Sequence, residues 1–403
     1  MIAYVVILAV AFGATVLTVP LVRRFCLRVG LVYEPNERTV HTRPMPALGG
    51  LAMFVGFAAA LGVAALLGRF KPMMSGTEMA GAALCCAVAF ATGLTDDVRH
   101  LSAPAKVAGL VLSGSILSLS GLSLLFFRVP FFDLLVLSPD LSALLTVIWV
   151  VGMANAINLI DGLDGLAAGI TAIAAAAFLA YSLALSRNGV LDPSNVGPLI
   201  AVIVLGVCLG FLPYNVHPAK IIMGDGGALF LGAAMATSTI AVGGNSDDPF
   251  SGQAWFFFAP LLVPLFILGV PILDTAFSIV RRTVGRSGVS VADRKHLHHR
   301  LVDRGHGHRR AVFILWGWTA LLSGFVLIPV FTGRGDGIVP IGILALLLAL
   351  FTMLGPSVTL HWARRRAAAE STTETPVVSI KDGGSTSDHA TPTRTDTRAG
   401  ARR

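Results

Sequence analysis

Long apolar stretches recur through most of the chain, and short polar segments separate them. Most of the stretches approach the roughly 20 residues that a helix needs to cross a hydrocarbon core of about 30 Å. We therefore predict an all-α, polytopic integral membrane protein with about eleven transmembrane helices. The predicted spans are residues 1–22, 48–68, 79–95, 105–122, 141–158, 163–186, 196–214, 226–243, 256–281, 311–332 and 338–362.

The first stretch is interpreted as a span, not as a cleaved signal peptide. Its positive charges, Arg23 and Arg24, follow the apolar run, whereas a secretory signal carries them in front of it. The N-terminus is then expected outside and the C-terminus in the cytoplasm. Residues 122–140 are apolar but contain Arg128 and Asp133, so we expect an outer hairpin or a re-entrant piece.

Composition excludes a water-soluble globule. Of the 403 residues, 55% are hydrophobic and 13% are charged, and this leaves too little polar surface to coat a soluble protein. The net charge of +8 is not accompanied by a basic stripe interleaved with aromatic residues, so we expect no nucleic-acid partner. The four cysteines form neither a disulfide framework nor a metal pair.

The positive charges are distributed unevenly between the two sides of the predicted topology. The segments expected in the cytoplasm contain 25 of the 30 lysines and arginines, which agrees with the positive-inside rule. All ten histidines also lie on or beside this side. We expect two parts: an integral membrane domain over residues 1–366 and a disordered cytoplasmic tail over residues 367–403, where large apolar residues almost vanish.

Acidic residues gather at the predicted inner ends of the spans. Asp96 and Asp97 close the third span, where two adjacent carboxylates repel each other and oppose the helix dipole. A bound cation would relieve them, although a solvated helix end is the alternative. Asp225 lies between glycines at the start of the eighth span and is either a helix cap or a metal ligand.

The string NAINLIDGLDGLAAG places four polar side chains at intervals of three residues, Asn155, Asn158, Asp161 and Asp164. Its glycines allow a ligand to approach the backbone closely. Amides and carboxylates at a membrane boundary suit a sugar nucleotide and a hard cation, and a plain polar turn is the alternative. Lys106 starts the fourth span, where it either neutralises a phosphate or extends to the interface.

The basic string RKHLHHRLVDRGHGHRR holds a further candidate group. His296, His298, His299 and Arg300 together favour binding of a pyrophosphate. A simple topology signal and a zinc site are the alternatives. Arg38, His41 and Arg43 in the first inner loop either contact a lipid phosphate or anchor the topology.

These residues resemble a known family. The strings PNERTVHTRPMPALGG, TGLTDDVRHLSAPAK, NAINLIDGLDGLAAG, MGDGGALFLG, PILDTAFSIVRR and RKHLHHRL occur in the order typical of polyprenyl-phosphate N-acetylhexosamine-1-phosphate transferases. The resemblance covers roughly residues 30–310. It implies transfer of HexNAc-1-phosphate from a UDP-sugar, UDP-GlcNAc above all, to polyprenyl phosphate, with release of UMP and with Mg²⁺ or, as a substitute, Mn²⁺.

The resemblance also implies a role for each candidate. Asp225 is similar to the magnesium ligand, with Asn158 as a second, and Asp96 and Asp97 resemble the catalytic pair. The nucleotide and phosphate pocket is expected to include Lys106, Asn155, Asp161 and Asp164, and the sugar diphosphate is expected to meet His296, His298, His299 and Arg300. Leu297 interrupts the three consecutive histidines typical of pentapeptide-handling members, which favours the GlcNAc branch.

Several alternatives stay open from sequence. The reaction is either a single in-line displacement or a two-step path through an aspartyl phosphate on Asp96 or Asp97. The competing functions are phospho-MurNAc-pentapeptide transfer and, in another class, cation-coupled secondary transport. The family further suggests a homodimer in the bacterial plasma membrane, with its active site on the cytoplasmic face.

Overall fold

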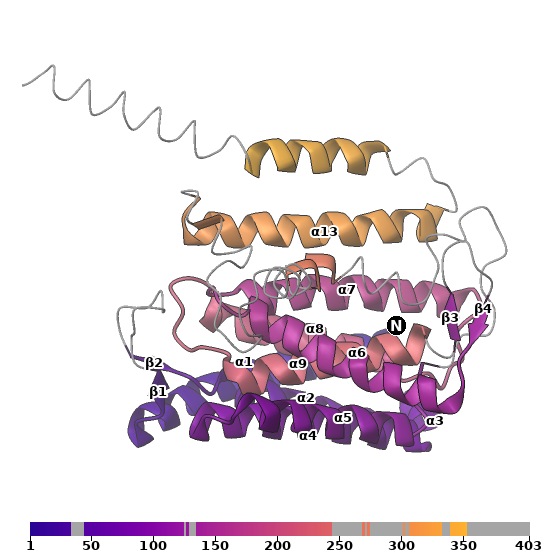
Figure 1. Ribbon diagram of the computed structural model, residues 1–403, viewed down its shortest axis with the longest axis horizontal. Helices are drawn as coiled ribbons and strands as arrows, with labels where there is room; N and C mark the ends of the chain where they lie inside the picture. Colours follow the sequence, from indigo (N-terminus) through magenta and orange to yellow (C-terminus); the bar gives the residue numbers. More distant parts are fainter. Residues whose placement is uncertain are drawn as a thin grey trace, which may run out of the picture. The chain divides into compact units, whose positions relative to one another are not determined.

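Helices make up almost all of the regular structure in the computed structural model (Figure 1). The structure describes residues 1–33, 44–124, 126–128, 134–243, 268–270, 272–274, 301–302, 306–332 and 339–352. The main helices are α1 (Ile2–Val29), α2 (Gly49–Leu66), α4 (Thr77–Arg99), α5 (Ala103–Leu119), α6 (Pro139–Ile160), α7 (Leu166–Arg187), α8 (Gly197–Asn215), α9 (Gly224–Gly243) and α13 (His308–Thr332). A short 3-10 turn (Gly68–Phe70) and α3 (Lys71–Met74) join α2 to α4.

Eight of the described helices are long and apolar enough to cross a membrane: α1, α2, α4, α6, α7, α8, α9 and α13. Two shorter apolar helices, α5 and Val339–Thr352, coincide with two further predicted spans. For the predicted span 256–281 the structure describes only residues 268–270 and 272–274. The prediction of a helical, multi-pass membrane protein is confirmed, while the disordered tail predicted over residues 367–403 lies outside the described residues.

Two pairs of short antiparallel strands connect helices. Strands β1 (Val32–Tyr33) and β2 (Met45–Pro46) pair with Val32 opposite Pro46. Strands β3 (Phe126–Arg128) and β4 (Leu134–Val136) pair with Phe126 opposite Val136. These two strands are the described part of the segment between α5 and α6 that was predicted as a hairpin or a re-entrant piece, and their antiparallel pairing agrees with a hairpin.

Helix α4 ends later than the sequence indicated. It continues to Arg99, and His100 then adopts a left-handed conformation (φ 52°) whose N–H donates to the carbonyl of Asp96. A left-handed residue with this backbone hydrogen bond is a common way to end a helix. Asp96 and Asp97 consequently lie within the last turn of α4, where the helix fixes the directions of their side chains.

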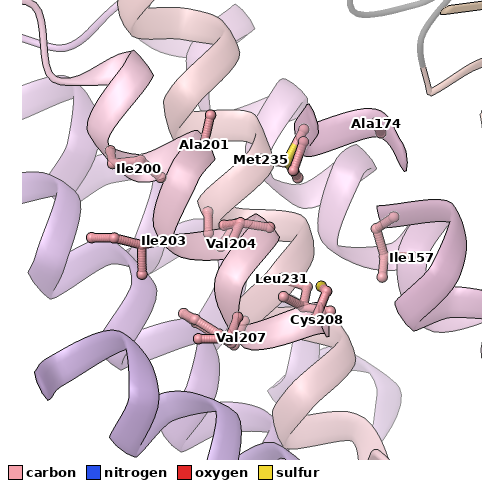
Figure 2. Packing of buried hydrophobic residues seen from close by; sticks show 14 of the residues in the cluster. Ile157, Ala174, Ile200, Ala201, Ile203, Val204, Val207, Cys208, Leu231 and Met235 are labelled. Atoms are coloured by element: carbon pink, nitrogen blue, oxygen red, sulfur yellow. The ribbon is translucent and has the colours of Figure 1, made fainter. Parts of the chain in front are cut away.

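Helix α9 is the most enclosed helix among those described. It packs against α2, α4, α6 and α8, and every residue from Gly226 to Gly243 is buried. Figure 2 shows part of this core, where Leu231 and Met235 of α9 lie among side chains of α8 such as Val204 and Cys208. Most α9 residues are Gly, Ala, Ser or Thr, which lets neighbouring backbones approach closely.

The hydroxyl groups of α9 are satisfied within the helical bundle. Ser238 donates to the carbonyl of Gly197 at 2.8 Å, and Thr239 accepts from the indole N–H of Trp149 at 2.9 Å. An unsatisfied polar group is costly where water is absent. These bonds therefore allow polar residues to line contacts between spans.

One glycine of α2 permits the closest approach to α9. A Cβ atom built at Gly50 would overlap the backbone nitrogen of Gly227, whereas Gly62 of the same helix has open space at that position. The N–H of Gly50 also donates to the carbonyl of Met223 at 2.7 Å. The start of α2 is thus fitted directly against the segment that leads into α9.

We expect Gly50→Ala to destabilise the protein by about 1–3 kcal/mol, because an inserted methyl group must displace backbone atoms. Gly62→Ala is the matched control, since it makes the same change in the same helix without a steric conflict. The measurement is the thermal unfolding midpoint of both variants in detergent. Equal midpoints for the two variants would contradict the close approach of α2 and α9.

Candidate active site

The carboxylate of Asp97 binds the beginning of α9. Its Oδ1 accepts the backbone N–H of Asp225 at 2.8 Å, and its Oδ2 accepts that of Gly226 at 2.9 Å. The first N–H groups of a helix have no partner within the helix, and a carboxylate complements their positive dipole end. Asp97 of α4 therefore fixes the position of Asp225.

Two glycines make this contact sterically feasible. Gly224 has a positive φ of 76°, and a Cβ there would overlap the carbonyl oxygen of Ala47. A Cβ at Gly93 would overlap the carbonyl oxygen of Asp225. The backbone of α4 and the first turn of α9 are thereby brought together without an intervening side chain.

Lys106 lies between two carboxylates. Its Nζ is 2.6 Å from Asp96 Oδ2 and makes a very short contact with Asp225 Oδ2. Asp96 Oδ1 accepts the backbone N–H of Leu101 at 2.6 Å, which holds the turn between α4 and α5. The three charged side chains are 14–28% exposed, so the arrangement is accessible from outside the protein.

Asp161 extends this acidic group from the end of α6. It is the residue that caps the C-terminus of that helix, and its side chain is partly buried. Burial, together with the nearby carboxylates of Asp225, Asp97 and Asp164, raises the pKa of Asp161 to about 8. The acids of α4, α6 and α9 thus share one electrostatic environment.

The other candidates of this string are held in different ways. Asn155 donates from Nδ2 to the carbonyl of Val151 in its own helix at 2.7 Å, and Asn158 lies in the last turn of α6, where its carbonyl accepts from the N–H of Asp161. Asp164 faces two histidines: its Oδ2 is 2.7 Å from His217 Nδ1, and its N–H donates to His308 Nε2 at 2.9 Å.

The predicted pyrophosphate-binding group, His296, His298, His299 and Arg300, lies outside the described residues. The same holds for Arg38, His41 and Arg43 of the first inner loop. The described part of the site therefore consists of Asp96, Asp97, Lys106, Asp161 and Asp225, with Asn155, Asn158 and Asp164 on the adjoining turns.

The donor set fits a hard divalent cation. Asp96, Asp97, Asp161 and Asp225 bring four carboxylates together, and of the described residues only Lys106 contributes a cation that contacts this group. Oxygen ligands are those that Mg²⁺ prefers. The Lys106 ammonium lies between the oxygens of Asp225 and Asp96.

Comparison with known proteins identifies the family. Residues 79–243 match the family model described as glycosyl transferase family 4. The chain is 37% identical over 342 residues to the decaprenyl-phosphate N-acetylglucosaminephosphotransferase of Mycolicibacterium smegmatis, an alignment that covers 83% of this chain and 84% of the relative. The chain belongs to the polyprenyl-phosphate N-acetylhexosamine-1-phosphate transferase family.

Two further relatives have names that differ in the glycosyl phosphate group they transfer. A Bacillus subtilis protein described as a probable undecaprenyl-phosphate N-acetylglucosaminyl 1-phosphate transferase is 38% identical over 79% of this chain and 85% of its own length. A phospho-N-acetylmuramoyl-pentapeptide-transferase of Desulforudis audaxviator is 32% identical over 78% of this chain and 95% of its own length. The protein is thus a membrane-embedded transferase of glycosyl phosphate groups, as its six ordered motifs indicated.

Sequence reasoning did not single out two histidines of this transferase. His217 and His308 contact Asp164, and their rings stack with centroids 4.3 Å apart. Each was interpreted only as part of the general excess of histidine at the inner side. The proximity of His217 to Asp225 along the chain was the available signal, but its partner Asp164 is 53 residues away in sequence.

We expect Lys106→Met to lower the stability of the transferase in the presence of a chelator by about 1–3 kcal/mol, because two carboxylates lose their shared ammonium. Excess Mg²⁺ is expected to restore the thermal midpoint and to raise it more in the variant than in the parent protein. Lys71→Met, which removes an exposed lysine of α3, is the control. An equal Mg²⁺ response in parent and Lys106→Met would contradict the assignment of a cation site.

Asp161 predicts a pH dependence of stability in the absence of divalent ions. Its folded-state pKa of about 8 lies above the unfolded value of 3.8, so deprotonation increasingly disfavours the folded state as the pH rises from about 4 to about 8. Asp161→Asn should therefore match the parent most closely near pH 4 and exceed its thermal midpoint by most at pH 8.5.

The control for this experiment is Asp192→Asn. Asp192 lies in the loop between α7 and α8, where hydrogen bonds from Ser194 lower its pKa. Its replacement should give no gain at high pH. A constant difference between Asp161→Asn and the parent across the pH range would show that Asp161 does not titrate in this window.

Proposed function

We propose that this transferase moves GlcNAc-1-phosphate from UDP-GlcNAc to polyprenyl phosphate, giving polyprenyl-diphospho-GlcNAc and UMP. The relatives from Mycolicibacterium smegmatis and Bacillus subtilis are named for N-acetylglucosamine phosphotransfer to decaprenyl or undecaprenyl phosphate. The product would be the first lipid-linked intermediate of a cell-envelope glycopolymer.

The observation that carries the proposal is the Lys106 ammonium between Asp96 and Asp225, with Asp97 holding the start of α9. Both substrates of the proposed reaction are anions, so the site must offset their mutual repulsion and align them. A bound Mg²⁺, or Mn²⁺ as a substitute, would supply the positive charge that the diphosphate requires. Asp225 would hold it, with Asn158 as a further ligand.

The chain's own residues have complementary tasks in this proposal. Lys106 can exchange its carboxylate partners for a phosphate oxygen, because its ammonium lies on a flexible stem. Asp97 keeps Asp225 in place through the two N–H groups of α9. Of the pair Asp96 and Asp97, only Asp97 caps α9. Asp96 would take the last proton from the acceptor phosphate.

An in-line displacement explains the arrangement with the fewest steps. An oxygen of the acceptor phosphate attacks the phosphorus that carries the sugar, and the bond from that phosphorus to the UMP oxygen breaks. The acceptor is already largely dianionic near pH 7, since its second pKa is about 6, and no strong base is required. His296, His298, His299 and Arg300 would bind the diphosphate. The nucleotide side would be lined by Asn155, Asp161 and Asp164.

We further propose a bacterial plasma-membrane location with the active site on the cytoplasmic face. Asp97, Lys106, Asp161 and Asp225 all lie within a few residues of a helix end, and the segments at this end of the predicted topology hold 25 of the 30 lysines and arginines. The same charge count supports eleven spans with the N-terminus outside and a cytoplasmic tail over residues 367–403. A homodimer remains part of the proposal by resemblance to the family.

Pentapeptide transfer is the competing reaction within the family, since a relative with that name is 32% identical. The HLHHR sequence and the higher identity to the GlcNAc-type relatives, 37–39%, support the GlcNAc reaction. Cation-coupled transport would require a binding site near the bilayer midplane, whereas Asp96, Asp97, Asp161 and Asp225 lie at helix ends.

The decisive measurement is release of UMP by the purified protein in detergent, supplied with polyprenyl phosphate, Mg²⁺ and a panel of UDP-sugars. We expect turnover with UDP-GlcNAc and a loss of at least about 100-fold in Asp225→Asn, the scale on which removal of a charge-stabilising group acts. Asp192→Asn should retain parent activity. Comparable turnover by Asp225→Asn would remove the metal assignment, and turnover with only UDP-MurNAc-pentapeptide would replace the substrate.

A further inference from the structure

Asp164, His217 and His308 form a hydrogen-bonded group beside the acidic site, which we call the Asp164 cluster. Asp164 is 6% exposed, and its Oδ2 accepts from His217 Nδ1 at 2.7 Å and from the N–H of Ala219 at 3.1 Å. Its own N–H donates to His308 Nε2 at 2.9 Å. The two imidazole rings stack at an interplanar angle of 25°.

Three separate pieces of the chain meet in the Asp164 cluster. Asp164 lies in the turn that carries Asp161. His217 lies in the loop between α8 and α9 that leads to Asp225, and His308 is the first residue of α13. Arg309 strengthens the same junction, because its guanidinium donates to the carbonyl of His217 at 3.0 Å.

Asn215 adds a second tie between two of these pieces. Its Oδ1 accepts the N–H of Gly165 at 3.0 Å, and its Nδ2 donates to the carbonyl of Ile221 at 3.1 Å. Gly165 has a positive φ of 78°, so the turn from 161 to 165 is tightly defined. The positions of Asp161 and Asp225 therefore depend on the same set of hydrogen bonds.

A metal ion is a competing explanation, because Asp164, His217 and His308 each offer a ligand atom and these atoms lie within 4.8 Å of one another. The 2.7 Å separation of Asp164 Oδ2 and His217 Nδ1 is a hydrogen-bond distance, whereas neighbouring ligands on a tetrahedral zinc ion stand about 3.3 Å apart. The lone pair of His308 Nε2 is also used by the N–H of Asp164. The geometry thus favours hydrogen bonds over metal ligation.

Two described residues before His308, Leu301 and His306, are also buried. The side chain of Leu301 is buried, and the buried His306 donates from Nε2 to the carbonyl of Thr352 at 2.8 Å. Leu301 directly follows Arg300 in sequence. Contacts to other parts of the protein are thus described at Leu301 and at His306, on the N-terminal side of His308.

We propose that His308 is a positioning residue for donor binding: through Asp164 and His217 it fixes the Asp161 turn, the loop before Asp225 and the start of α13 as one unit. This inference rests on the proposed transferase function. This role is separate from the predicted substrate contact of Asp164, because His308 acts through the hydrogen bond that it accepts from the Asp164 N–H.

The first test compares His308→Ala with His308→Gln, whose amide oxygen can still accept the N–H of Asp164. We expect His308→Ala to raise KM for UDP-GlcNAc about tenfold, the effect of losing one buried hydrogen bond, with KM for polyprenyl phosphate unchanged. His308→Gln should recover most of the affinity. Arg310→Ala, which removes an exposed side chain in the same first turn of α13, is the control and should behave as the parent protein.

A second measurement is independent of activity. Hydrogen–deuterium exchange should quicken at residues 161–165 and 215–223 in His308→Ala, but not in His308→Gln or Arg310→Ala. If the parent releases no UMP from any UDP-sugar, the proposed function fails while this exchange pattern still supports the cluster. Unchanged exchange at both segments, an equal rise of both KM values, or stoichiometric Zn²⁺ binding that His308→Ala abolishes would overturn the positioning role.

Discussion

The contact on which the rest of this structure depends is that between the Asp97 carboxylate and the first N–H groups of α9. Helix α9 is buried from Gly226 onwards, and its first N–H groups need partners from outside the helix. An acid from another helix performs this task. The requirement for a cap thereby also sets the distance between the acids of α4 and Asp225 of α9.

The small residues of α9 follow from the same constraint. A carboxylate on α4 reaches the α9 backbone only if the two helices approach closely, and Gly93 and Gly224 remove the Cβ atoms that would prevent it. Gly50 does the same for α2. Close packing of spans is thus coupled to the geometry of the acidic site, and a change in one alters the other.

The sequence predicted the helices better than the site. Most spans were located within a few residues, because apolar length is a strong local signal. The identity of the acidic group was also predictable, since Asp96, Asp97, Lys106, Asp161 and Asp225 occur at predicted helix ends. Their individual tasks were not: that Asp97 caps α9, and that Lys106 bridges Asp96 and Asp225, depends on contacts between residues 119 to 129 positions apart.

Asp164 illustrates why such tasks escape a reading of the sequence. It is spaced by three residues from Asp161, and the regular spacing suggested one shared role for both. The turn from 161 to 165 is not helical, however, and Gly165 in its left-handed conformation redirects the chain. Asp161 consequently lies near the acids of α4 and α9, whereas the carboxylate of Asp164 is hydrogen-bonded to His217.

The acids of the site lie at the ends of apolar helices, and most of them have a partner of opposite polarity. Burying an ionised group at membrane depth has a high free-energy cost. The cost is lower at helix ends, where water and hydrogen-bond partners are available. Each acid described here has a distinct compensation: helix N–H groups for Asp97, an ammonium for Asp96 and Asp225, and an imidazole for Asp164. For Asp161, burial and the neighbouring carboxylates raise the pKa to about 8, which favours the neutral form at pH 7.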